Sequence, residues 1–362
     1  MAAIRPRVWV SQPLFDDIVD QLRAHCDVDA ANEVTQYDAD GVAAALRDAD
    51  GALVTLNERI GAAELAVAPR LRAIANVGVG YNNLDIPALD AAGIIATNTP
   101  DVLTETTADL GFALLMAAAR RITESERWLR EGHWGQWSFS TMLGADIHGR
   151  TLGILGMGRI GQAIARRGHH GFGMDVLYHN RSRLPEATER ETGARYAGFD
   201  ELLARADHLV LVLPYSAASH HVIDATALAK MKPTATLVNI ARGGLVDELA
   251  LADALAHGRL AAAGLDVYEG EPAVRPELLA LRNVVLTPHI GSASLATRRA
   301  MVQLAVDNLV AALGFGPRAG DPPTPVTTKK TSITTAAAGV AKAATGAITG
   351  SAGADKTATG KR

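Results

Sequence analysis

Short apolar runs alternate with amphipathic segments over residues 1–320. This alternation is typical of βαβ units, in which buried parallel strands are connected by helices. The runs predict ten strands: Arg7–Val10, Ala52–Leu56, Ala73–Val77, Ile94–Thr97, Thr151–Leu155, Asp175–His179, His208–Leu213, Ala235–Ile240, Ala262–Val267 and Asn283–Leu286. Because ten strands exceed one ordinary sheet, the pattern predicts an α/β fold with two mostly parallel sheets.

Two longer segments have helical spacing. Residues 103–121 combine good helix formers with a start rich in Thr and Asp, and they lie between the two groups of strands. Residues 294–313 follow the last strand. We expect the first helix to cross between two domains and the second to return and complete the N-terminal domain.

The composition changes after Pro323. From Thr324 to Arg362 the chain has no aromatic residue, and six Lys and Arg face one acidic residue, Asp355. Such a segment buries too little apolar surface to offset its chain entropy, so we predict a disordered, mildly basic tail over residues 321–362. A solubilising role is the plain expectation, and the alternative is an electrostatic tether to nucleic acid or another anionic surface.

Composition excludes several classes of protein. The chain is 48% apolar, and its 35 Lys and Arg nearly balance 39 Asp and Glu, so bulk charge does not indicate nucleic-acid binding. The single cysteine, Cys26, rules out internal disulfides and fits a reducing cytosol. The N-terminus lacks a secretory pattern, and the apolar run at 110–119 is half of the ~20 residues that a bilayer span needs. We therefore expect a cytoplasmic protein without membrane contact.

A glycine-rich loop follows one predicted strand. The sequence Gly-Met-Gly-Arg-Ile-Gly at residues 156–161 comes after the strand at 151–155 and opens a helical segment. In such a loop the first glycine permits a tight turn, the second lets the backbone approach a pyrophosphate, and the third allows close packing of helix and strand. Free N–H groups at the helix start then hold the phosphates. Gly156, Gly158 and Gly161 are thus predicted to bind a dinucleotide.

The end of the next strand indicates which dinucleotide is preferred. An NAD site carries Asp or Glu there, about 20 residues beyond the glycines, to accept from the ribose 2′-OH. Here Asn180 stands in that place, followed by Arg181 and Arg183. Arginine side chains pair with a 2′-phosphate through charge-assisted hydrogen bonds. We therefore predict NADP(H) over NAD(H).

Three polar segments interrupt the apolar pattern in the second half of the chain, at residues 239–244, 264–272 and 287–291. Each follows the carboxyl end of a predicted strand, where open α/β sheets bind their ligands. Their residues suit the reduction of a carbonyl group. His289 is the natural proton donor, Glu271 or Asp266 could orient it, and Arg242 could hold a carboxylate in a bidentate fork.

These segments closely resemble the D-isomer-specific 2-hydroxyacid dehydrogenase family. The similarity extends to residues 77–85 and 98–104 and so covers nearly all of residues 1–320. It implies a catalytic triad of Arg242, Glu271 and His289. It also implies two Rossmann-like domains, a discontinuous substrate domain of residues 1–101 and 290–320 around a dinucleotide-binding domain of residues 102–289.

The resemblance also implies ligand contacts. Gly78, Val79 and Gly80 would hold the substrate carboxylate with backbone N–H groups, beside Arg242 and His289, and Leu56 or Asn57 would line the pocket. The remaining expected cofactor contacts are Thr104, Arg159, Ile160, Leu213, Ala241 and Asp266.

Within the family, residues 180–183 and 101–107 are most similar to glyoxylate/hydroxypyruvate reductases and 2-ketogluconate reductases. We therefore expect NADPH-dependent reduction of small 2-keto acids to D-2-hydroxy acids, with His289 as the proton donor. The alternative is a dinucleotide-sensing scaffold, like the corepressors that share this fold. Loss of NADPH absorbance on adding glyoxylate would distinguish the two.

The segment at residues 133–137 resembles the one by which those reductases form dimers. The resemblance predicts a homodimer in which Trp137 reaches the partner's pocket, and the alternative is an aromatic residue packed in its own loop. The pairs His169-His170 and His220-His221 do not have the spacing of a metal motif such as HExxH. The sequence therefore predicts no metal site.

Overall fold

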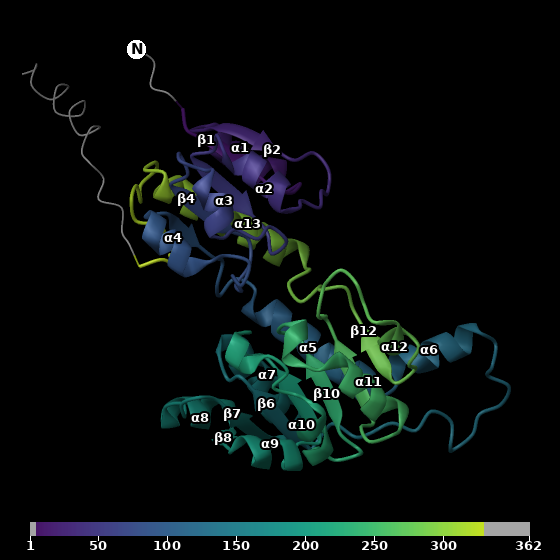
Figure 1. The fold of residues 1–362 in the computed structure, drawn as a ribbon. Coiled ribbons are helices and arrows are strands. Elements are labelled where there is room, and N and C mark those ends of the chain that lie inside the picture. Colours follow the sequence, from purple (N-terminus) through teal and green to yellow (C-terminus); the bar gives the residue numbers. More distant parts are fainter. Residues whose placement is uncertain (1–4, 329–362) are drawn as a thin grey trace, which may run out of the picture.

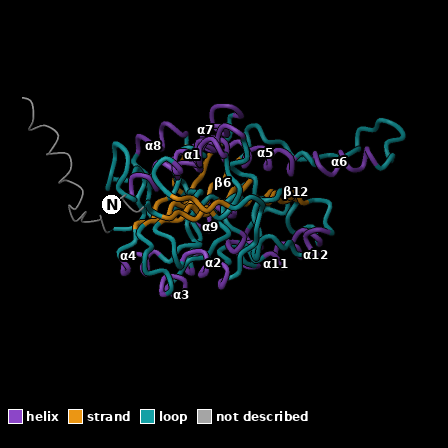
Figure 2. The backbone as a smooth tube through the Cα atoms, turned by 90° about the horizontal axis from the view of Figure 1, so that it is seen from above, coloured by secondary structure: helices purple, strands orange, loops and turns teal. Residues whose placement is uncertain are grey.

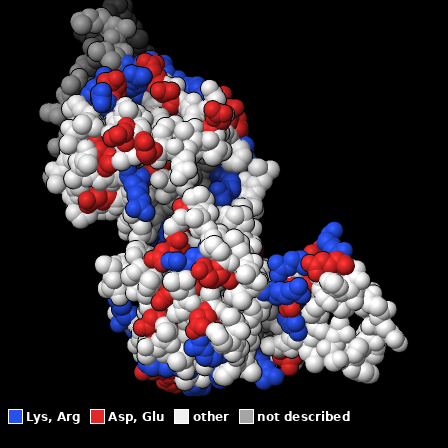
Figure 3. All heavy atoms as spheres, turned by 45° about the vertical axis from the view of Figure 1, so that its right-hand side comes forward, with Lys and Arg blue, Asp and Glu red and all other residues white. Residues whose placement is uncertain are grey.

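The computed structural model describes residues 5–328, and these form two lobes joined by a narrow waist (Figures 1 and 3). Each lobe is built on one sheet, and every strand pair in both sheets is parallel. The predicted fold class, two parallel α/β sheets, is confirmed. No helix among residues 5–328 combines the length and the apolarity that a bilayer crossing requires.

The first lobe contains a five-stranded sheet of order β2-β1-β3-β4-β5. Helices α1 and α13 pack on one face, and α2 and α4 pack on the other. The bounds are β1 Arg7–Val10, α1 Asp16–Arg23, β2 Asp27–Ala30, α2 Ala39–Leu46, β3 Gly51–Val54, α3 Ala62–Ala66, β4 Ala73–Asn76, α4 Ile86–Ala92 and β5 Ile95–Thr97, with α13 at Leu295–Ala312.

The second lobe contains a seven-stranded sheet of order β12-β11-β10-β9-β6-β7-β8. Helices α5 and α7 cover one face, and α9, α10, α11 and α12 cover the other. The bounds are α5 Thr104–Ala119, α6 Ile122–Arg130, β6 Thr151–Leu155, α7 Arg159–Arg166, β7 Asp175–His179, α8 Glu186–Thr192, β8 Ala194–Tyr196, α9 Phe199–Arg205, β9 His208–Leu211, α10 Ala225–Lys230, β10 Thr236–Asn239, α11 Glu248–Ala256, β11 Ala262–Leu265, α12 Pro276–Leu279 and β12 Val284–Leu286.

The strand order indicates where a ligand is expected to bind at this sheet. Strand β6 lies between β7 and β9, so the chain leaves it in one direction and returns on its other side. Ligands of open α/β sheets bind beyond the carboxyl ends of the strands at such a reversal. The glycine-rich loop at residues 156–161 directly follows β6, and it therefore begins at this point.

The sequence pattern did not predict two of the observed strands. The edge strands β2 and β8 have the sequences Asp-Val-Asp-Ala and Ala-Arg-Tyr and are largely exposed. Each pairs with one neighbour only. Because an edge strand with a solvated face needs no apolar run, its sequence carries little signal. The other ten strands occur where they are predicted, with ends that differ by up to two residues.

The chain crosses between the lobes twice. Helix α5 packs on β10 and β11 of the second sheet, whereas α13 returns to β3, β4 and β5 of the first (Figure 1). The hydroxyl groups of Thr106 and Thr297 lie 2.7 Å apart and join these two helices. The first sheet is thus completed by the C-terminal helix, as expected. The exact domain boundaries at 101, 102, 289 and 290 stay predictions.

The structure corrects the start of the predicted tail. Pro325 bridges antiparallel to Thr97 on the edge strand β5, and the Val326 N–H donates to the Ala96 carbonyl at 2.8 Å. Asn308 of α13 accepts from the Thr324 N–H at 2.9 Å. Backbone pairing to an open sheet edge needs no apolar run, so disorder from residue 321 is wrong for residues 321–328. Residues 329–362 of the predicted tail lie outside the described residues.

One segment projects from the second lobe. Helix α6 and the loop that follows it extend away from the body (Figure 2). This arm, residues 122–146, carries exposed aromatic side chains: Trp137 is 66% exposed and Phe139 is 87% exposed. Their rings contact each other with centroids 4.7 Å apart. Trp137 is therefore an accessible side chain of the arm.

Candidate active site

The turn after β10 carries Arg242. Asn239, the last residue of the strand, donates from Nδ2 to the Arg242 carbonyl at 2.9 Å, and its Oδ1 accepts from the Ala241 N–H at 3.0 Å. Arg242 itself donates from Nη1 to the Ala241 carbonyl at 2.6 Å. Burial lowers the pKa of the Arg242 guanidinium, and the negative charge of Glu271 opposes that shift. The buried Asn239 thus shapes the turn that presents the arginine.

Gly243 lets this turn lie directly against the next polar loop. A Cβ atom on Gly243 would lie 1.8 Å from the Tyr268 carbonyl carbon and 2.1 Å from the Glu269 nitrogen. No side chain fits at such distances. The glycine therefore brings residues 242 and 268–271, which are distant in sequence, into contact.

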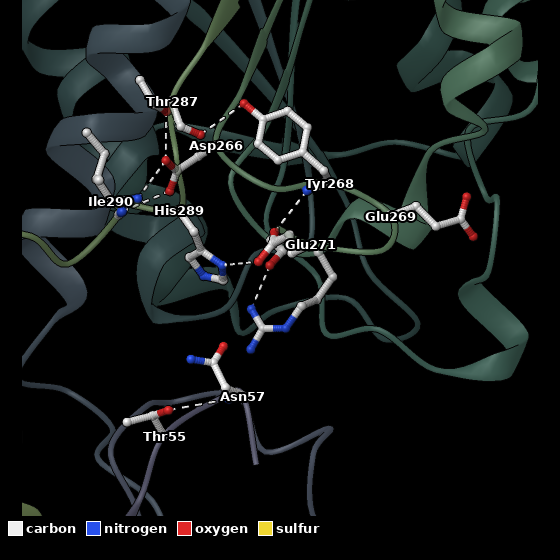
Figure 4. Close-up of polar contacts among 12 residues, drawn as sticks. Thr55, Asn57, Asp266, Tyr268, Glu269, Glu271, Thr287, His289 and Ile290 are labelled. Carbon is white, nitrogen blue, oxygen red and sulfur yellow. Dashed lines mark hydrogen bonds and ion pairs between the residues drawn. The ribbon is translucent and has the colours of Figure 1, made fainter. Parts of the chain in front are cut away.

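His289 and Glu271 form a hydrogen-bonded pair. The imidazole Nδ1 lies 2.7 Å from Glu271 Oε2, and the other carboxylate oxygen accepts from the Tyr268 N–H at 2.9 Å (Figure 4). Both side chains are about one-third exposed, at 32% and 33%. Burial alone raises the pKa of the Glu271 carboxyl. The hydrogen bond and charge of His289 outweigh that effect, aided by Arg242, and hold the pKa below its usual range.

Asp266 holds the turn that carries His289. Its carboxylate accepts from the Thr287 hydroxyl at 2.7 Å and from the backbone N–H groups of Ile290 and Gly291, each at 2.8 Å (Figure 4). Its carbonyl accepts from the His289 N–H at 2.9 Å. Burial raises the pKa of the Asp266 carboxyl, against the opposing effect of these hydrogen bonds. Of the two candidate orienters of His289, Glu271 touches the imidazole, whereas Asp266 holds the turn that carries it.

The first lobe contributes a glycine loop that reaches Arg242. A Cβ atom on Gly80 would lie 1.9 Å from Arg242 Nη2, so the loop backbone rests on the guanidinium group. Gly78 lies close to Leu56, whose Cδ2 would be 2.9 Å from an added Cβ. Val79 between them is 36% exposed. The structure thus brings the predicted carboxylate loop and the predicted carboxylate anchor together.

A buried amide network shapes this loop, and the sequence analysis missed it. Asn76 donates from Nδ2 to the Gly80 carbonyl at 3.0 Å, and Asn83 donates to Asn76 Oδ1 at 3.1 Å and to the Thr55 carbonyl at 2.9 Å. The asparagines at positions 76, 82 and 83 were a possible signal because they cluster beside the glycines. Figure 4 shows Asn57 of the same lobe facing Glu271 and His289.

The glycine-rich loop has the geometry of a phosphate cradle. Gly156 has a φ of +101°, and a Cβ there would lie 2.5 Å from the Leu213 nitrogen. A Cβ on Gly161 would lie 2.4 Å from the Gly156 carbonyl oxygen, whereas one on Gly158 would meet nothing within 4 Å. Two positions are therefore closed by backbone packing and the third faces open space at the start of α7. These residues fit a dinucleotide pyrophosphate.

The other predicted cofactor residues lie around this loop. Arg159, the first residue of α7, forms an ion pair with Asp101 at 2.5 Å, and Thr104 is the first residue of α5. Ile160 packs against the core under α5, and Ala241 is buried in the turn after β10. The structure thus groups them at the carboxyl edge of the second sheet.

The three predicted cofactor residues after β7 differ in their hydrogen-bond partners. Asn180 Oδ1 accepts from the Met157 N–H at 2.7 Å and so braces the glycine-rich loop. Arg183 is held by the buried Glu189, with Nε at 2.9 Å from Oε1 and Nη2 at 2.7 Å from Oε2. Arg181 is exposed and makes no side-chain hydrogen bond or ion pair with the described residues. Of the two predicted phosphate partners, Arg181 is therefore the available one.

Residues 112–291 match the model of the NAD-binding domain of the D-isomer specific 2-hydroxyacid dehydrogenases. Two curated proteins are similar to most of the chain. A glyoxylate reductase of Thermococcus onnurineus is 45% identical over 312 residues, which cover 85% of this chain and 93% of the relative. A glyoxylate/hydroxypyruvate reductase B of Erwinia tasmaniensis is 45% identical over 311 residues, which cover 86% and 96%.

A solved structure agrees with this similarity. The crystal structure of an NADPH-dependent glyoxylate/hydroxypyruvate reductase from Sinorhizobium meliloti, in complex with NADP and malonate, superposes with a TM-score of 0.76 at 36% sequence identity. The alignment covers 89% of this chain and 97% of that one. Both lobes and the connection between them are therefore shared.

Proposed function

The chain belongs to the D-isomer specific 2-hydroxyacid dehydrogenase family, and from this premise we propose that it reduces glyoxylate, hydroxypyruvate and 2-ketogluconate to D-2-hydroxy acids with NADPH. The observation that carries the proposal is the His289–Glu271 pair at 2.7 Å. The two loops that carry this pair lie beside the turn that carries Arg242. Arg242 in turn touches the Gly80 loop of the other lobe.

We propose a task for each group. The N–H groups of Val79 and Gly80, with the Arg242 guanidinium, would bind and orient the substrate carboxylate. Glu271 occupies the imidazole Nδ1, so His289 is left with Nε2 to hold the proton that the new alkoxide takes. When bound, the reduced nicotinamide supplies the hydride. Gly156, Gly158 and Gly161 would hold its pyrophosphate.

A turnover panel tests this function directly. Glyoxylate, hydroxypyruvate, 2-ketogluconate, pyruvate and phenylpyruvate are each offered with NADPH and with NADH, and the loss of absorbance of the reduced nicotinamide is followed. We expect turnover of glyoxylate, hydroxypyruvate and 2-ketogluconate with NADPH. Binding of NADPH without turnover of any acid would instead favour the dinucleotide-sensing scaffold.

The preference for NADPH rests on Arg181. Arg181 is exposed and directly follows Asn180, which stands where an NAD site carries a carboxylate. A guanidinium group there would pair with the 2′-phosphate of NADPH, whereas the NADH ribose offers only hydroxyl groups. The Sinorhizobium meliloti relative is described as NADPH-dependent, which supports the same preference here.

Replacing Arg181 by alanine is expected to raise the KM for NADPH at least about tenfold, since a hydrogen bond to a charged group contributes ~1.5–3 kcal/mol. The KM for NADH should stay the same, because NADH has no 2′-phosphate. Steady-state kinetics with both cofactors measures the change. Arg190→Ala is the matched control, because Arg190 is an exposed arginine of α8 paired with Glu186. An unchanged KM for NADPH in the Arg181 variant would contradict the assignment.

We also propose that the protein is a homodimer held by the arm. The exposed Trp137 and Phe139 of the arm are apolar side chains that a second copy would cover. The variant Trp137→Ala/Phe139→Ala is expected to sediment as a monomer at concentrations where the unaltered protein is a dimer. Val34→Ala, which alters an apolar side chain 86% exposed on the other lobe, is the control and should remain dimeric. A dimer that survives loss of both aromatic side chains would exclude this role for the arm.

A further inference from the structure

Three potential metal ligands meet on the loops that follow β9 and β11. His220 and His221 are adjacent, and Glu269 comes from 48 residues further along the chain. His221 Nε2 lies 3.2 Å from Glu269 Oε2, and the two imidazole rings stack with centroids 3.8 Å apart. One ligand atom from each residue lies within 4.8 Å of the other two.

We propose that His220, His221 and Glu269 form a binding site for a divalent cation of the zinc type. Two imidazoles and one carboxylate are a donor set that Zn²⁺ uses, with water in the fourth position. Tetrahedral bonds of about 2.0–2.1 Å place two ligand atoms about 3.3 Å apart, which matches the 3.2 Å between His221 Nε2 and Glu269 Oε2. His220 is exposed, so its side chain can turn toward the other two without disturbing the core.

The surroundings of the histidines suit metal binding. The Tyr215 hydroxyl lies 3.2 Å from His220 Nδ1, which leaves Nε2 of that ring as the free ligand atom. A metal-bound imidazole usually donates its second N–H to such an outer partner, which fixes the ring's tautomer and orientation. His221 instead directs its Nε2 at Glu269, so this nitrogen and the carboxylate can bind the same ion.

The backbone holds His221 in a fixed position. Its φ of +50° lies in the left-handed region, and its N–H donates to the Gly244 carbonyl at 2.8 Å. Left-handed residues other than glycine persist where the surrounding structure imposes them, and they cluster at functional sites. His289 of the candidate active site has the same feature, with a φ of +52°.

One positive charge lies near the proposed ligands. Arg275 Nη2 is 3.7 Å from Glu269 Oε2, but Arg275 Nε is also 3.3 Å from the buried carboxylate of Glu248. Glu248 accepts from the Glu269 N–H at 2.7 Å. Because Glu248 keeps the guanidinium in place, the Glu269 carboxylate can exchange its longer contact with Arg275 for a metal ion.

Calorimetric titration of the metal-free, full-length protein with Zn²⁺ tests the site without substrate or dinucleotide, so its outcome is independent of the proposed reaction. We expect one Zn²⁺ per chain, and no binding of Mg²⁺, which requires octahedral oxygen ligands. Separate His220→Ala and Glu269→Gln variants should each weaken Zn²⁺ binding more than about tenfold, because each loses a direct ligand. Circular dichroism of the His220 variant, altered at an exposed position, checks that the fold is intact.

Two control variants make the result specific. His170→Ala removes a histidine of the other adjacent pair, whose Nε2 lies 3.0 Å from the Glu191 carbonyl oxygen, and this variant should bind Zn²⁺ normally. His289→Ala should also retain Zn²⁺, which separates this site from the His289–Glu271 pair. Unchanged affinity in the His220 and Glu269 variants, or loss of binding in either control variant, would overturn the proposal. Co²⁺ in place of Zn²⁺ gives a spectroscopic check, since its visible absorption reports imidazole ligation and should disappear with His220→Ala.

Discussion

Replacing His289 by alanine is expected to lower kcat for glyoxylate reduction by about 10²- to 10⁴-fold, the usual contribution of a general acid. Glu271 holds the imidazole at Nδ1, and hydrogen bonds from the His289 backbone N–H hold the turn that carries it, so Nε2 is fixed in orientation. Without it the developing alkoxide must take its proton from water. Steady-state kinetics at saturating NADPH measures the loss, and fluorescence titration should show unchanged NADPH binding.

His257→Ala is a matched control for this prediction. His257 also pairs with a carboxylate, Asp253 Oδ1 at 2.9 Å, but it lies at the exposed end of α11. Its loss should leave kcat unchanged. Glu271→Gln should reduce kcat less than His289→Ala, because the amide can still hydrogen-bond to the imidazole while lacking the negative charge that favours imidazolium. Near-normal turnover by the His289 variant would remove that residue from the proposed mechanism.

Arg242→Gln is expected to lower kcat/KM for glyoxylate by roughly 30- to 4,000-fold, since removing one partner of a buried charge pair costs about 2–5 kcal/mol. Much of the effect should be a higher KM, because the guanidinium would bind the carboxylate both before and during hydride transfer. Arg242 is shielded by the Gly80 loop, so water cannot readily replace it. Initial rates over a range of glyoxylate concentrations give both constants.

Two further measurements sharpen the Arg242 prediction. Added guanidinium ions should partly restore turnover of the Arg242 variant, which loss of folding would not allow. Arg195→Gln, at an exposed arginine paired with Asp175 at 2.7 Å, should behave like the unaltered protein. An Arg242 variant with an ordinary KM for glyoxylate would show that another group anchors the carboxylate.

Most of the core strands could be predicted because a strand buried on both faces must be an apolar run. Strand β3 is an example, with every residue buried. The edge strand β2 could not be predicted in this way. It pairs with β1 through backbone hydrogen bonds, and its side chains are exposed or half-buried, so its sequence need not be apolar. For the same reason the sequence did not predict that residues 324–328 are ordered. They lie along β5 because the folded sheet leaves the edge of that strand unpaired.

The sequence predicted those positions of the candidate site that only one or a few residue types can occupy. Gly156 has a φ of +101° and Gly243 lies against the backbone of another loop, so both positions require glycine and appear in the sequence as motifs. Arg181 and Arg183 looked equivalent in the sequence. Their difference depends on Glu189, which the fold places beneath Arg183 but not beneath Arg181.

By itself the sequence determined the two parallel sheets, the glycine-rich loop and the identity of the residues at the strand ends, because local chain conformation and burial restrict which residues occur there. Only the tertiary structure decided which side chains touch. It assigned Glu271 rather than Asp266 to the imidazole of His289, and it brought Glu269 to His221 across 48 residues. Contacts of this kind depend on the packing of several loops at once, and spacing along the chain does not encode that packing.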